Sequence, residues 1–335
     1  MAVDPYPLTF HPILLPKVWG GRRLAHWGKS LPPQTNIGES WELADLDSTA
    51  PGGGGGGAAQ SVIANGPFAG TTLRAAMQSW GPALLGRTSP TASGGFPLLV
   101  KFLDAREHLS VQVHPSPAYA QAHPDCHLKT ESWFVLEADP ADGQTPVIFE
   151  GLRPGVGPDD LREAINNSRV PDVLRSTPAA PGACHTLPSG TIHALGAGVL
   201  VAEVQTPSDT TFRVYDWTRE YNRKDRGLHV AESLACVQFD PPAPPTRCPK
   251  GQSRASLART PHYTIDEVRG DGALPPAKDA ATVLMVVSGS GSLESTSDTL
   301  SLHPGLTVLV PATCACRWTG PLRLLQIQVG LPPGK

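Results

Sequence analysis

Three polar side chains alternate with valines in the segment Leu-Ser-Val-Gln-Val-His-Pro, which ends at position 115. In a β-strand, residues two positions apart point to the same face. Ser110, Gln112 and His114 would therefore share one face, and the two valines between them would share the other. Because the buried face of an ordinary strand is apolar, a face that carries a hydroxyl, a carboxamide and an imidazole indicates the wall of a polar cavity.

The same alternation returns in the segment Lys-Thr-Glu-Ser-Trp, where Lys129, Glu131 and Trp133 would share a face. Carboxylate and imidazole groups bind metal ions, and a lysine ammonium attracts an anion. If the two segments form neighbouring strands, they predict a site that holds a metal ion and an anionic substrate together.

A further imidazole comes from His193, at the end of the pattern Gly-x5-Pro-x-Gly-x2-His that begins at Gly182. The pattern resembles the second conserved motif of the cupin superfamily, small β-barrels whose metal-binding histidine stands at this place. Zinc accepts imidazole nitrogen and carboxylate oxygen, whereas a carboxamide oxygen suits other divalent ions as well. The candidate metal ligands are Gln112, His114, Glu131 and His193.

A candidate anion-binding residue, Arg213, lies in the aromatic segment at 211–217, where alternation would place it on one face with Tyr215 and Trp217. A surface ion pair is the ordinary role of such an arginine, but the apolar strand favours a position that faces the cavity. Arginine binds phosphate through a planar fork and lysine binds it as a point charge. The side chains that could meet a sugar phosphate are Lys129, Arg213 and Arg219.

Two more charged residues lie inside otherwise apolar predicted strands. Glu203, in residues 199–205, would share a face with Gln205. Lys101 lies in residues 97–103, and a buried lysine needs a partner or a function. Contact with a substrate and a side chain that extends its ammonium to solvent are equally open for Lys101.

Short strands and one helical segment must position these residues. The helix is predicted at 158–167, because acidic residues occupy its first turn and its apolar residues are spaced for one face, and a further helical turn is predicted at 170–174. The other strands expected in this part of the chain are 108–114, 130–138, 146–149 and 183–187.

Two segments rich in Gly or Pro are expected to lack regular structure. Residues 51–60 contain six consecutive glycines, but no Gly-Lys-Ser/Thr follows them, as a phosphate-binding loop would require. Residues 240–262 read as a Pro-rich linker. After it, a short all-β pattern predicts strands at 263–268, 282–288, 291–294, 298–302, 306–310 and 322–329.

A weak internal repeat relates the two halves of the chain. The Gly-x5-Pro spacing recurs at Gly305 and Pro311, but Thr313 and Cys316 stand where the first copy has its second glycine and its histidine. The C-terminal β domain is therefore expected to be degenerate, with Cys316 as a packed thiol rather than a metal ligand.

The composition favours strands and turns over long helices, because the 335 residues include 34 glycines and 36 prolines. A net charge of −3 gives no electrostatic footprint for nucleic acid or an acidic membrane, and no apolar run could span a bilayer. Six cysteines without a CxxC pair predict neither a disulfide framework nor a zinc finger. Since the N-terminus also lacks the basic region of a signal peptide, a cytoplasmic protein is expected. No sequence feature decides its oligomeric state.

Several ordered motifs together resemble the type I mannose-6-phosphate isomerases, in particular their shorter bacterial branch. The resemblance is strong over residues 10–235 and weak over the C-terminal β domain. Its motifs are Trp-Gly-Gly at 19–21, Ile-Gly-Glu-Ser-Trp-Glu-Leu at 37–43, Leu-Asp-Ala at 103–105, Leu-Ser-Val-Gln-Val-His-Pro at 109–115, Lys-Thr-Glu-Ser-Trp at 129–133, Pro-Ser-Gly-Thr-Ile-His-Ala at 188–194 and Phe-Arg-Val-Tyr-Asp-Trp at 212–217.

The resemblance implies a mainly β fold of two cupin-type, jelly-roll β-barrels with a small helical insertion near 158–175. A catalytic, metal-binding domain would span 1–239 and a degenerate barrel 263–335, with the linker at 240–262 between them. The resemblance also implies one Zn²⁺ per chain on the four candidate ligands. Arg219 falls where longer relatives have a lysine. The residues with implied catalytic or substrate-contacting roles are Ser110, Lys129, Glu203 and Arg213.

The implied reaction interconverts mannose 6-phosphate and fructose 6-phosphate by moving a proton between C1 and C2 through a cis-enediol. Glu203 is the first candidate for the base and a metal-bound water or hydroxide the second, while Arg213 would polarise the substrate oxygens or guide the phosphate. Two other readings stay open. The first is a metal-dependent dioxygenase of the same superfamily, which the cations predicted to face the cavity disfavour. The second is a non-catalytic sugar-binding protein, which the intact set of candidate metal ligands disfavours.

Overall fold

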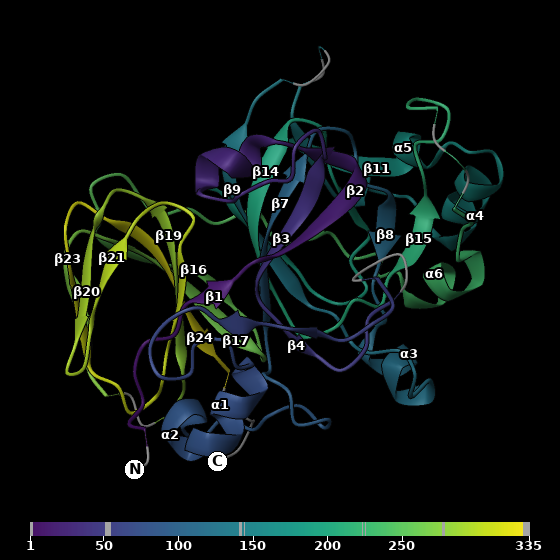
Figure 1. Cartoon of the computed structure of the whole chain (residues 1–335). Helices are drawn as coiled ribbons and strands as arrows, with labels where there is room; N and C mark the ends of the chain where they lie inside the picture. The colour runs from purple at the N-terminus through teal and green to yellow at the C-terminus, as the bar shows by residue number, and fades with distance from the viewer. Residues whose placement is uncertain are drawn as a thin grey trace.

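Two β-barrels lie side by side in the computed structural model, the first formed by the chain up to about residue 240 and the second by the remainder (Figure 1). The structure describes residues 3–50, 55–140, 143, 145–222, 224, 226–276 and 279–330. The mainly β architecture with few helices that the sequence predicted is confirmed.

Two antiparallel sheets face each other in the N-terminal barrel. One has the strand order β12-β9-β14-β7-β2-β3 and the other the order β11-β10-β13-β8-β15. The strands of the six-stranded sheet are β2 (Ile13–Gly21), β3 (Ile37–Leu43), β7 (Leu99–Ala105), β9 (Glu131–Ala138), β12 (Cys184–Leu187) and β14 (Val199–Gln205). Those of the five-stranded sheet are β8 (Val111–Val113), β10 (Val147–Leu152), β11 (Leu174–Pro178), β13 (His193–Leu195) and β15 (Phe212–Tyr215).

Successive side chains of the six-stranded sheet separate into two cores, as the two-residue period of a strand requires. Leu103 and Trp133 belong to the cluster inside the N-terminal barrel. Their chain neighbours Phe102 and Phe134 belong to a different cluster, shared with the C-terminal barrel. The inside of the barrel is therefore lined by one alternating set of residues, and the outside is covered by the second barrel.

Helices cover the outer face of the five-stranded sheet, on the side away from the C-terminal barrel (Figure 1). They are α4 (Pro158–Asn166), α5 (Val170–Val173) and α6 (Val230–Cys236), of which the first two form the predicted helical insertion. Leu161 and Ile165 of α4 join Val111 and Val113 of β8 in one buried cluster. Because the valines are held there, the opposite face of β8 points into the barrel.

Several elements have no counterpart in the sequence prediction. The short ones near the N-terminus and before β9 are β1 (Phe10–His11), η1 (Arg23–Trp27), β4 (Asp45–Leu46), β5 (Ala59–Gln60), β6 (Val62–Ile63), α1 (Leu73–Trp80), α2 (Pro82–Leu85) and α3 (Pro117–Ala122). The strands β2, β3, β11 and β13 and the helix α6 were also not predicted, nor were β18 (Gly272–Leu274) and β23 (Cys316–Thr319). Of the Gly-rich segment expected as a loop over 51–60, residues 51–54 lie outside the described residues, and the last two form β5 instead.

The C-terminal barrel also has two antiparallel sheets, with the strand orders β16-β17-β24-β19-β22 and β18-β23-β20-β21. Its strands are β16 (Arg254–Arg259), β17 (Tyr263–Arg269), β18 (Gly272–Leu274), β19 (Thr282–Ser288), β20 (Gly291–Ser295), β21 (Thr299–Leu302), β22 (Thr307–Val310), β23 (Cys316–Thr319) and β24 (Arg323–Val329). The expected linker at 240–262 therefore contains a strand, β16, which pairs with β17. Cys316 is 5% exposed in the apolar core of this barrel, and its Sγ lies 3.8 Å from Sγ of Cys314.

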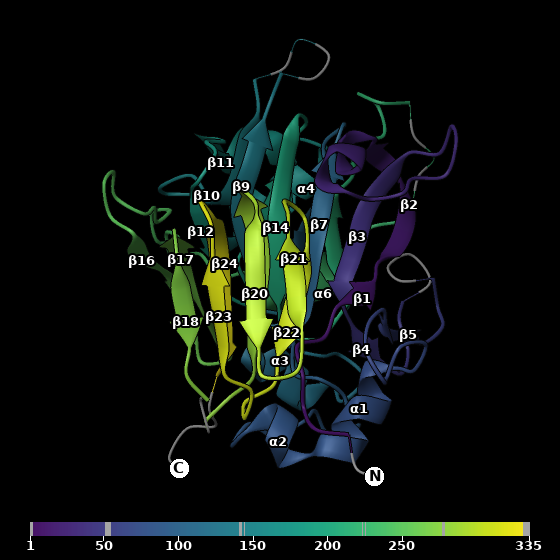
Figure 2. The same ribbon diagram turned by 60° about the vertical axis from the view of Figure 1, so that its left-hand side comes forward.

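An extensive apolar interface joins the two barrels. Figure 2 shows strands of the C-terminal barrel in front of those of the six-stranded sheet. Phe102 and Phe134 pack in one cluster with Ile265 and other aliphatic residues of the C-terminal five-stranded sheet. Tyr263, which is completely buried, places its Oη 3.0 Å from Oγ of Ser132 in β9. The second barrel thus supports β9 from outside, next to the strand's first residue, Glu131.

None of the helices among the described residues has both the length and the apolar character that crossing a lipid bilayer requires.

Replacing Tyr263 by Phe should lower the free energy of unfolding by about 1 kcal/mol, because it removes one buried hydrogen bond while keeping the ring. Urea unfolding measures the change. Tyr215→Phe is the control, since Tyr215 donates to the exposed Glu220 and water can replace that bond. A Tyr263→Phe protein as stable as the wild type would show that the contact between Tyr263 and Ser132 contributes nothing to the interface.

Candidate active site and metal centre

Three of the predicted metal ligands meet inside the N-terminal barrel. His114, Glu131 and His193 place one ligand atom each within 4.8 Å of the others. Oε1 of Glu131 lies 3.0 Å from Nε2 of His193, and its Oε2 lies 3.3 Å from Nε2 of His114. Each of the three residues is no more than 1% exposed. One carboxylate therefore stands between two imidazoles in a buried cluster.

Backbone carbonyls fix both imidazole rings. Nδ1 of His193 lies 2.8 Å from the carbonyl of Thr191, and Nδ1 of His114 lies 3.1 Å from that of Thr210. In the neutral ring, a proton on Nδ1 leaves Nε2 with a free lone pair, and metal-binding histidines commonly have such an outer partner. Burial and the nearby Lys129 lower the pKa of His114 to about 3, so this ring is neutral at physiological pH.

The fourth predicted ligand, Gln112, is the cross-strand neighbour of His193. Its Nε2 lies 3.3 Å from Nε2 of His193. A half-turn of the carboxamide exchanges its nitrogen and oxygen. With the oxygen in that place, Gln112 presents an oxygen donor beside Nε2 of His193, next to the cluster.

The cluster contains polar atoms that the described residues leave without hydrogen bonds. Nε2 of His114 and both carboxylate oxygens of Glu131 are among them, although Nζ of Lys129 forms an ion pair with Oε2 of Glu131 at 2.8 Å. Lys129 and the two imidazoles hold the pKa of Glu131 well below its usual range, against the effect of burial. Two imidazoles, one ionised carboxylate and a carboxamide can hold a divalent metal ion.

A row of polar and aromatic residues crosses the six-stranded sheet next to this cluster. Trp41, Lys101, Glu203 and Trp133 are successive cross-strand neighbours on β3, β7, β14 and β9. Nζ of Lys101 lies 3.1 Å from Oε1 of Glu203 and 3.4 Å from Oε2 of Glu39. Nε1 of Trp133 donates to Oε2 of Glu203 at 2.9 Å. Lys101 is thus buried with two carboxylates, and Glu203 has a partner on each oxygen.

The two carboxyl groups beside Lys101 differ in their pKa. Burial and the negative charge of Glu131 raise the pKa of Glu203, although Lys101 opposes the change. For Glu39, burial acts in the same direction, but Lys101 and Lys17 together lower the pKa to about 2. Glu39 is therefore a permanent anion, whereas Glu203 has the raised proton affinity that a general base requires.

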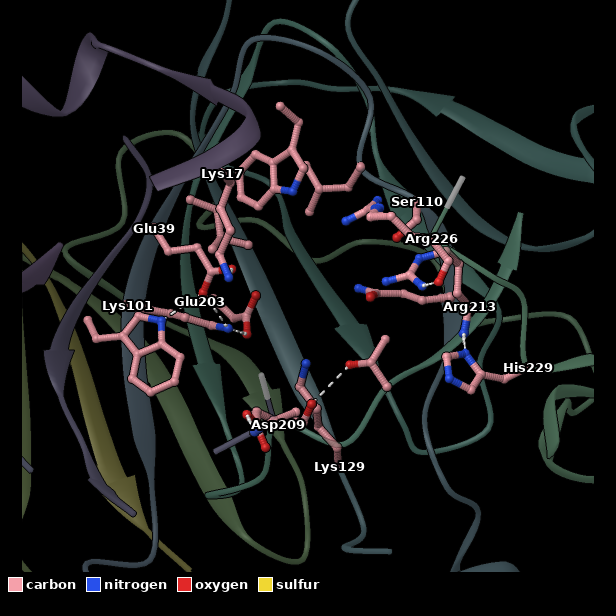
Figure 3. A pocket seen from close by; sticks show the side chains of 17 residues that line it. Lys17, Glu39, Lys101, Ser110, Lys129, Glu203, Asp209, Arg213, Arg226 and His229 are labelled. Carbon is pink, nitrogen blue, oxygen red and sulfur yellow. Dashed lines mark hydrogen bonds and ion pairs between the residues drawn. The ribbon is translucent and has the colours of Figure 1, made fainter. Parts of the chain in front are cut away.

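A cavity of about 480 Å³ opens above these groups. In Figure 3, Lys17, Glu39, Lys101 and Glu203 lie on one wall, Ser110, Arg213, Arg226 and His229 on the opposite wall, and Lys129 with Asp209 at the bottom. The lining includes five Lys or Arg side chains and three carboxylates. The cavity therefore has an excess of positive charge and suits an anionic ligand.

Two arginines on one wall share a buried carboxylate. Nε of Arg226 lies 2.6 Å from Oδ2 of Asp216, and Nε of Arg213 lies 4.0 Å from the same atom. Asp216 is 2% exposed in its side chain. Nη1 of Arg213 also donates to the carbonyl of Gly227 at 3.0 Å. These contacts hold both guanidinium groups at the cavity.

The structure brings nearly all the predicted site residues together. Arg219 is the exception, because it is exposed and absent from the cavity lining. His114, Glu131 and His193 form the buried cluster described above. The predicted residues that line the cavity are Lys101, Ser110, Gln112, Lys129, Glu203 and Arg213.

Sequence reasoning missed other residues of the cavity. Glu39 lies in the motif at 37–43, where its alternation with Trp41 was a usable signal. Arg226 and His229 come from a segment without helix or strand, which offers no periodic pattern. The other lining residues that were missed include Lys17, Trp19, Trp41, Asp209 and Thr211.

The expectation that Arg213, Tyr215 and Trp217 share one face is wrong. Arg213 lines the cavity, whereas Tyr215 and Trp217 pack with the outer cluster beneath the helices. The cause is an irregularity in β15, which pairs Arg213 with Gln112 but Tyr215 with the adjacent Val111. An extra residue of this kind breaks the two-residue alternation.

Known proteins resemble this chain in sequence and in structure. Residues 17–139 match the family model "Phosphomannose isomerase type I, catalytic domain". A mannose-6-phosphate isomerase of Streptococcus mutans is 32% identical over 313 residues, which cover 92% of this chain and 93% of the relative. The crystal structure of the mannose 6-phosphate isomerase of Bacillus subtilis has 28% sequence identity and a TM-score of 0.80, with 96% and 99% of the two chains covered.

A further structure, described as mannose 6-phosphate isomerase bound with zinc and yttrium, has 18% identity, a TM-score of 0.72 and coverage of 97% and 100%, and so agrees in fold. The family match spans the strands that carry Lys101, Gln112 and Glu131, and the similarity to the Streptococcus protein extends over nearly the whole chain. This chain belongs to the type I phosphomannose isomerase family.

Proposed function

We propose that this protein is a zinc-dependent aldose–ketose isomerase that interconverts mannose 6-phosphate and fructose 6-phosphate. One observation carries the proposal: a cavity lined by a carboxylate with a raised pKa and an excess of cationic side chains adjoins the candidate metal-ligand cluster through Gln112 and Lys129. The named activity of the Streptococcus and Bacillus relatives supports the choice of substrate.

Gln112, His114, Glu131 and His193 would hold the zinc ion. The donor set agrees with zinc chemistry, and a structural neighbour is described as binding zinc. A bound divalent ion supplies fixed positive charge, which stabilises negative charge on the oxygens at C1 and C2 of the sugar. Lys129, paired with Glu131 at 2.8 Å, adds a second positive charge at the same end of the cavity.

Glu203 would move the proton. As a carboxylate it would remove the proton from C2 of the aldose, which leaves a cis-enediolate. The hydroxyl proton would pass from O2 to O1 through the cis-enediol, and Glu203 would return its own proton to C1 to give the ketose. Its raised pKa strengthens it as a base. The ion pair with Lys101 opposes this rise, because the ammonium favours the carboxylate form.

The phosphate would bind at the opposite wall, between Arg213, Arg226 and Ser110. Two guanidinium groups that share one buried aspartate keep net positive charge at the cavity that they line. Ser110 adds a hydroxyl on the same wall (Figure 3). Lys101 would act mainly on Glu203, since its ammonium is already paired with two carboxylates.

The purified protein should convert mannose 6-phosphate to fructose 6-phosphate in a coupled assay, lose the activity after thorough chelation and regain it with zinc. Metal analysis before and after chelation shows how much zinc each chain holds. Absence of turnover by zinc-loaded protein would contradict the assignment of the reaction, and full turnover after metal removal would contradict the role of the metal.

Glu203→Gln should lower kcat by at least about 100-fold, because a carboxamide cannot accept the proton. Exchange of the substrate C2 hydrogen with solvent, followed by NMR in heavy water, should fall in parallel. Glu137→Gln is the control, since Glu137 lies outside the cavity and pairs with Arg23 at 3.7 Å. Unchanged exchange in Glu203→Gln would show that another group is the base.

Arg226→Gln should lower kcat/KM for mannose 6-phosphate about 10- to 100-fold, the expected loss of a hydrogen bond to a charged group. The activity on unphosphorylated mannose, however low, should not change. Arg219→Gln is the matched control, because Arg219 is exposed and does not line the cavity. Equal losses for the two variants, or equal losses on the two substrates, would contradict a phosphate site at Arg226.

A further inference from the structure

Trp133 is a large buried side chain that touches two parts of the site without lining the cavity. It is completely buried, and its Nε1 donates to Oε2 of Glu203 at 2.9 Å. Its ring meets the imidazole of His193 edge to face, with centroids 5.2 Å apart and an interplanar angle of 82°. One indole therefore contacts both the proposed base and a proposed metal ligand.

The two oxygens of Glu203 have partners of different kinds. Oε1 lies 3.1 Å from Nζ of Lys101, an ammonium on a flexible stem that is also 3.4 Å from Glu39. Oε2 accepts from the indole of Trp133. Rotation about the last torsion of a glutamate is soft, so a single mobile ammonium cannot fix the plane of the carboxylate. The rigid indole N–H supplies the second point that defines this plane.

The indole also differs from lysine in its acid–base chemistry. It is a donor only, and it neither gains nor loses a proton near neutral pH. It can orient Glu203 without taking the proton that the carboxylate must carry. Lys101 provides the positive charge that balances Glu203, and Trp133 provides a fixed hydrogen bond that orients its carboxylate.

A hydrogen-bonded imidazole and carboxylate lie on the far side of Trp133. His185 is its cross-strand neighbour on β12, opposite the side on which Glu203 lies. Nδ1 of His185 lies 2.7 Å from Oε2 of Glu150, whose Oε1 accepts from Nη2 of Arg175 at 3.0 Å. His185 and Glu150 are each 1% exposed. The indole is thus enclosed between a fixed imidazole and the carboxylate that it orients.

We propose that Trp133 is a positioning residue for the isomerisation: its N–H fixes the plane of Glu203, and its ring sets the distance of Glu203 from the metal ligand His193. This inference rests on the proposed function, in which Glu203 moves the proton. Trp133 would influence the substrate only through other residues, because it is absent from the lining of the cavity. Its loss should therefore affect the chemical step and leave substrate binding unchanged.

The test is Trp133→Phe, which keeps most of the ring and removes the donor. We expect kcat to fall about 10- to 100-fold, the cost of a catalytic group misplaced by about 1 Å, with KM and zinc content within about twofold of the wild type. Trp27→Phe is the matched control. It removes another Trp–Glu hydrogen bond, from Nε1 of Trp27 to Glu137 at 2.7 Å, away from the cavity lining.

A double-mutant cycle identifies the residue through which Trp133 acts. If it acts through Glu203, Trp133→Phe should cost almost nothing further in the Glu203→Gln background. Should Trp133→Phe fail to fold, incorporation of benzothienylalanine at position 133 replaces the N–H by sulfur in a ring of nearly equal size. The same fall in kcat is expected for that protein.

The outcomes separate the two proposals. An inactive wild-type protein loaded with zinc overturns the proposed function. An active wild type with an unchanged kcat in Trp133→Phe overturns the positioning role alone. A raised KM, lost zinc or full additivity in the double mutant also overturns it, because each shows that Trp133 supports the general structure of the site and not the base.

Discussion

Two carboxylates, Glu131 and Glu203, are buried in the interior of one barrel. Their negative charges must be balanced by nearby groups, and the other features of the site depend on this constraint. Their side chains are 0% and 2% exposed, and an isolated buried charge is too costly to persist. Each carboxylate has its own lysine, Lys129 or Lys101, at about hydrogen-bond distance. Glu131 lies in addition between two imidazoles. The interior of the barrel is polar because its charges occur in compensated groups.

The groups around Glu131 favour its ionised form more strongly than the groups around Glu203 do. This difference drives the pKa values of the two carboxylates apart. Glu131 is surrounded by cationic or metal-binding groups, which keep its pKa low. Glu203 lies near that negative charge, which raises its pKa. A carboxylate with a lowered pKa and a carboxylate with a raised pKa thus arise from the same residue type, on neighbouring strands of one sheet. Pairs of groups whose pKa values are driven apart in this way are typical of acid–base sites.

The fold and the metal centre could be predicted from the sequence wherever a strand keeps its two-residue period. Ser110, Gln112 and His114 were found because β8 and its flanks alternate without interruption. The prediction failed where the period is broken or absent. The irregularity in β15 separates Arg213 from Tyr215, and Arg226 lies in a segment without regular structure. The strand β16 was missed because prolines dominate its surroundings. Side-chain contacts such as that of Trp133 with Glu203 depend on the pairing of distant strands, which no single segment encodes.

The shared core between the barrels has a consequence for how this protein can change over evolutionary time. Phe102, Phe134 and their neighbours would be exposed to water if the first barrel were inherited without the second. Recombination that joined the catalytic half to a different domain would leave an aggregation-prone sheet. The second barrel, which has Cys316 where the first copy of the repeat has its histidine, covers that surface. We therefore expect the two halves to be inherited together as one unit.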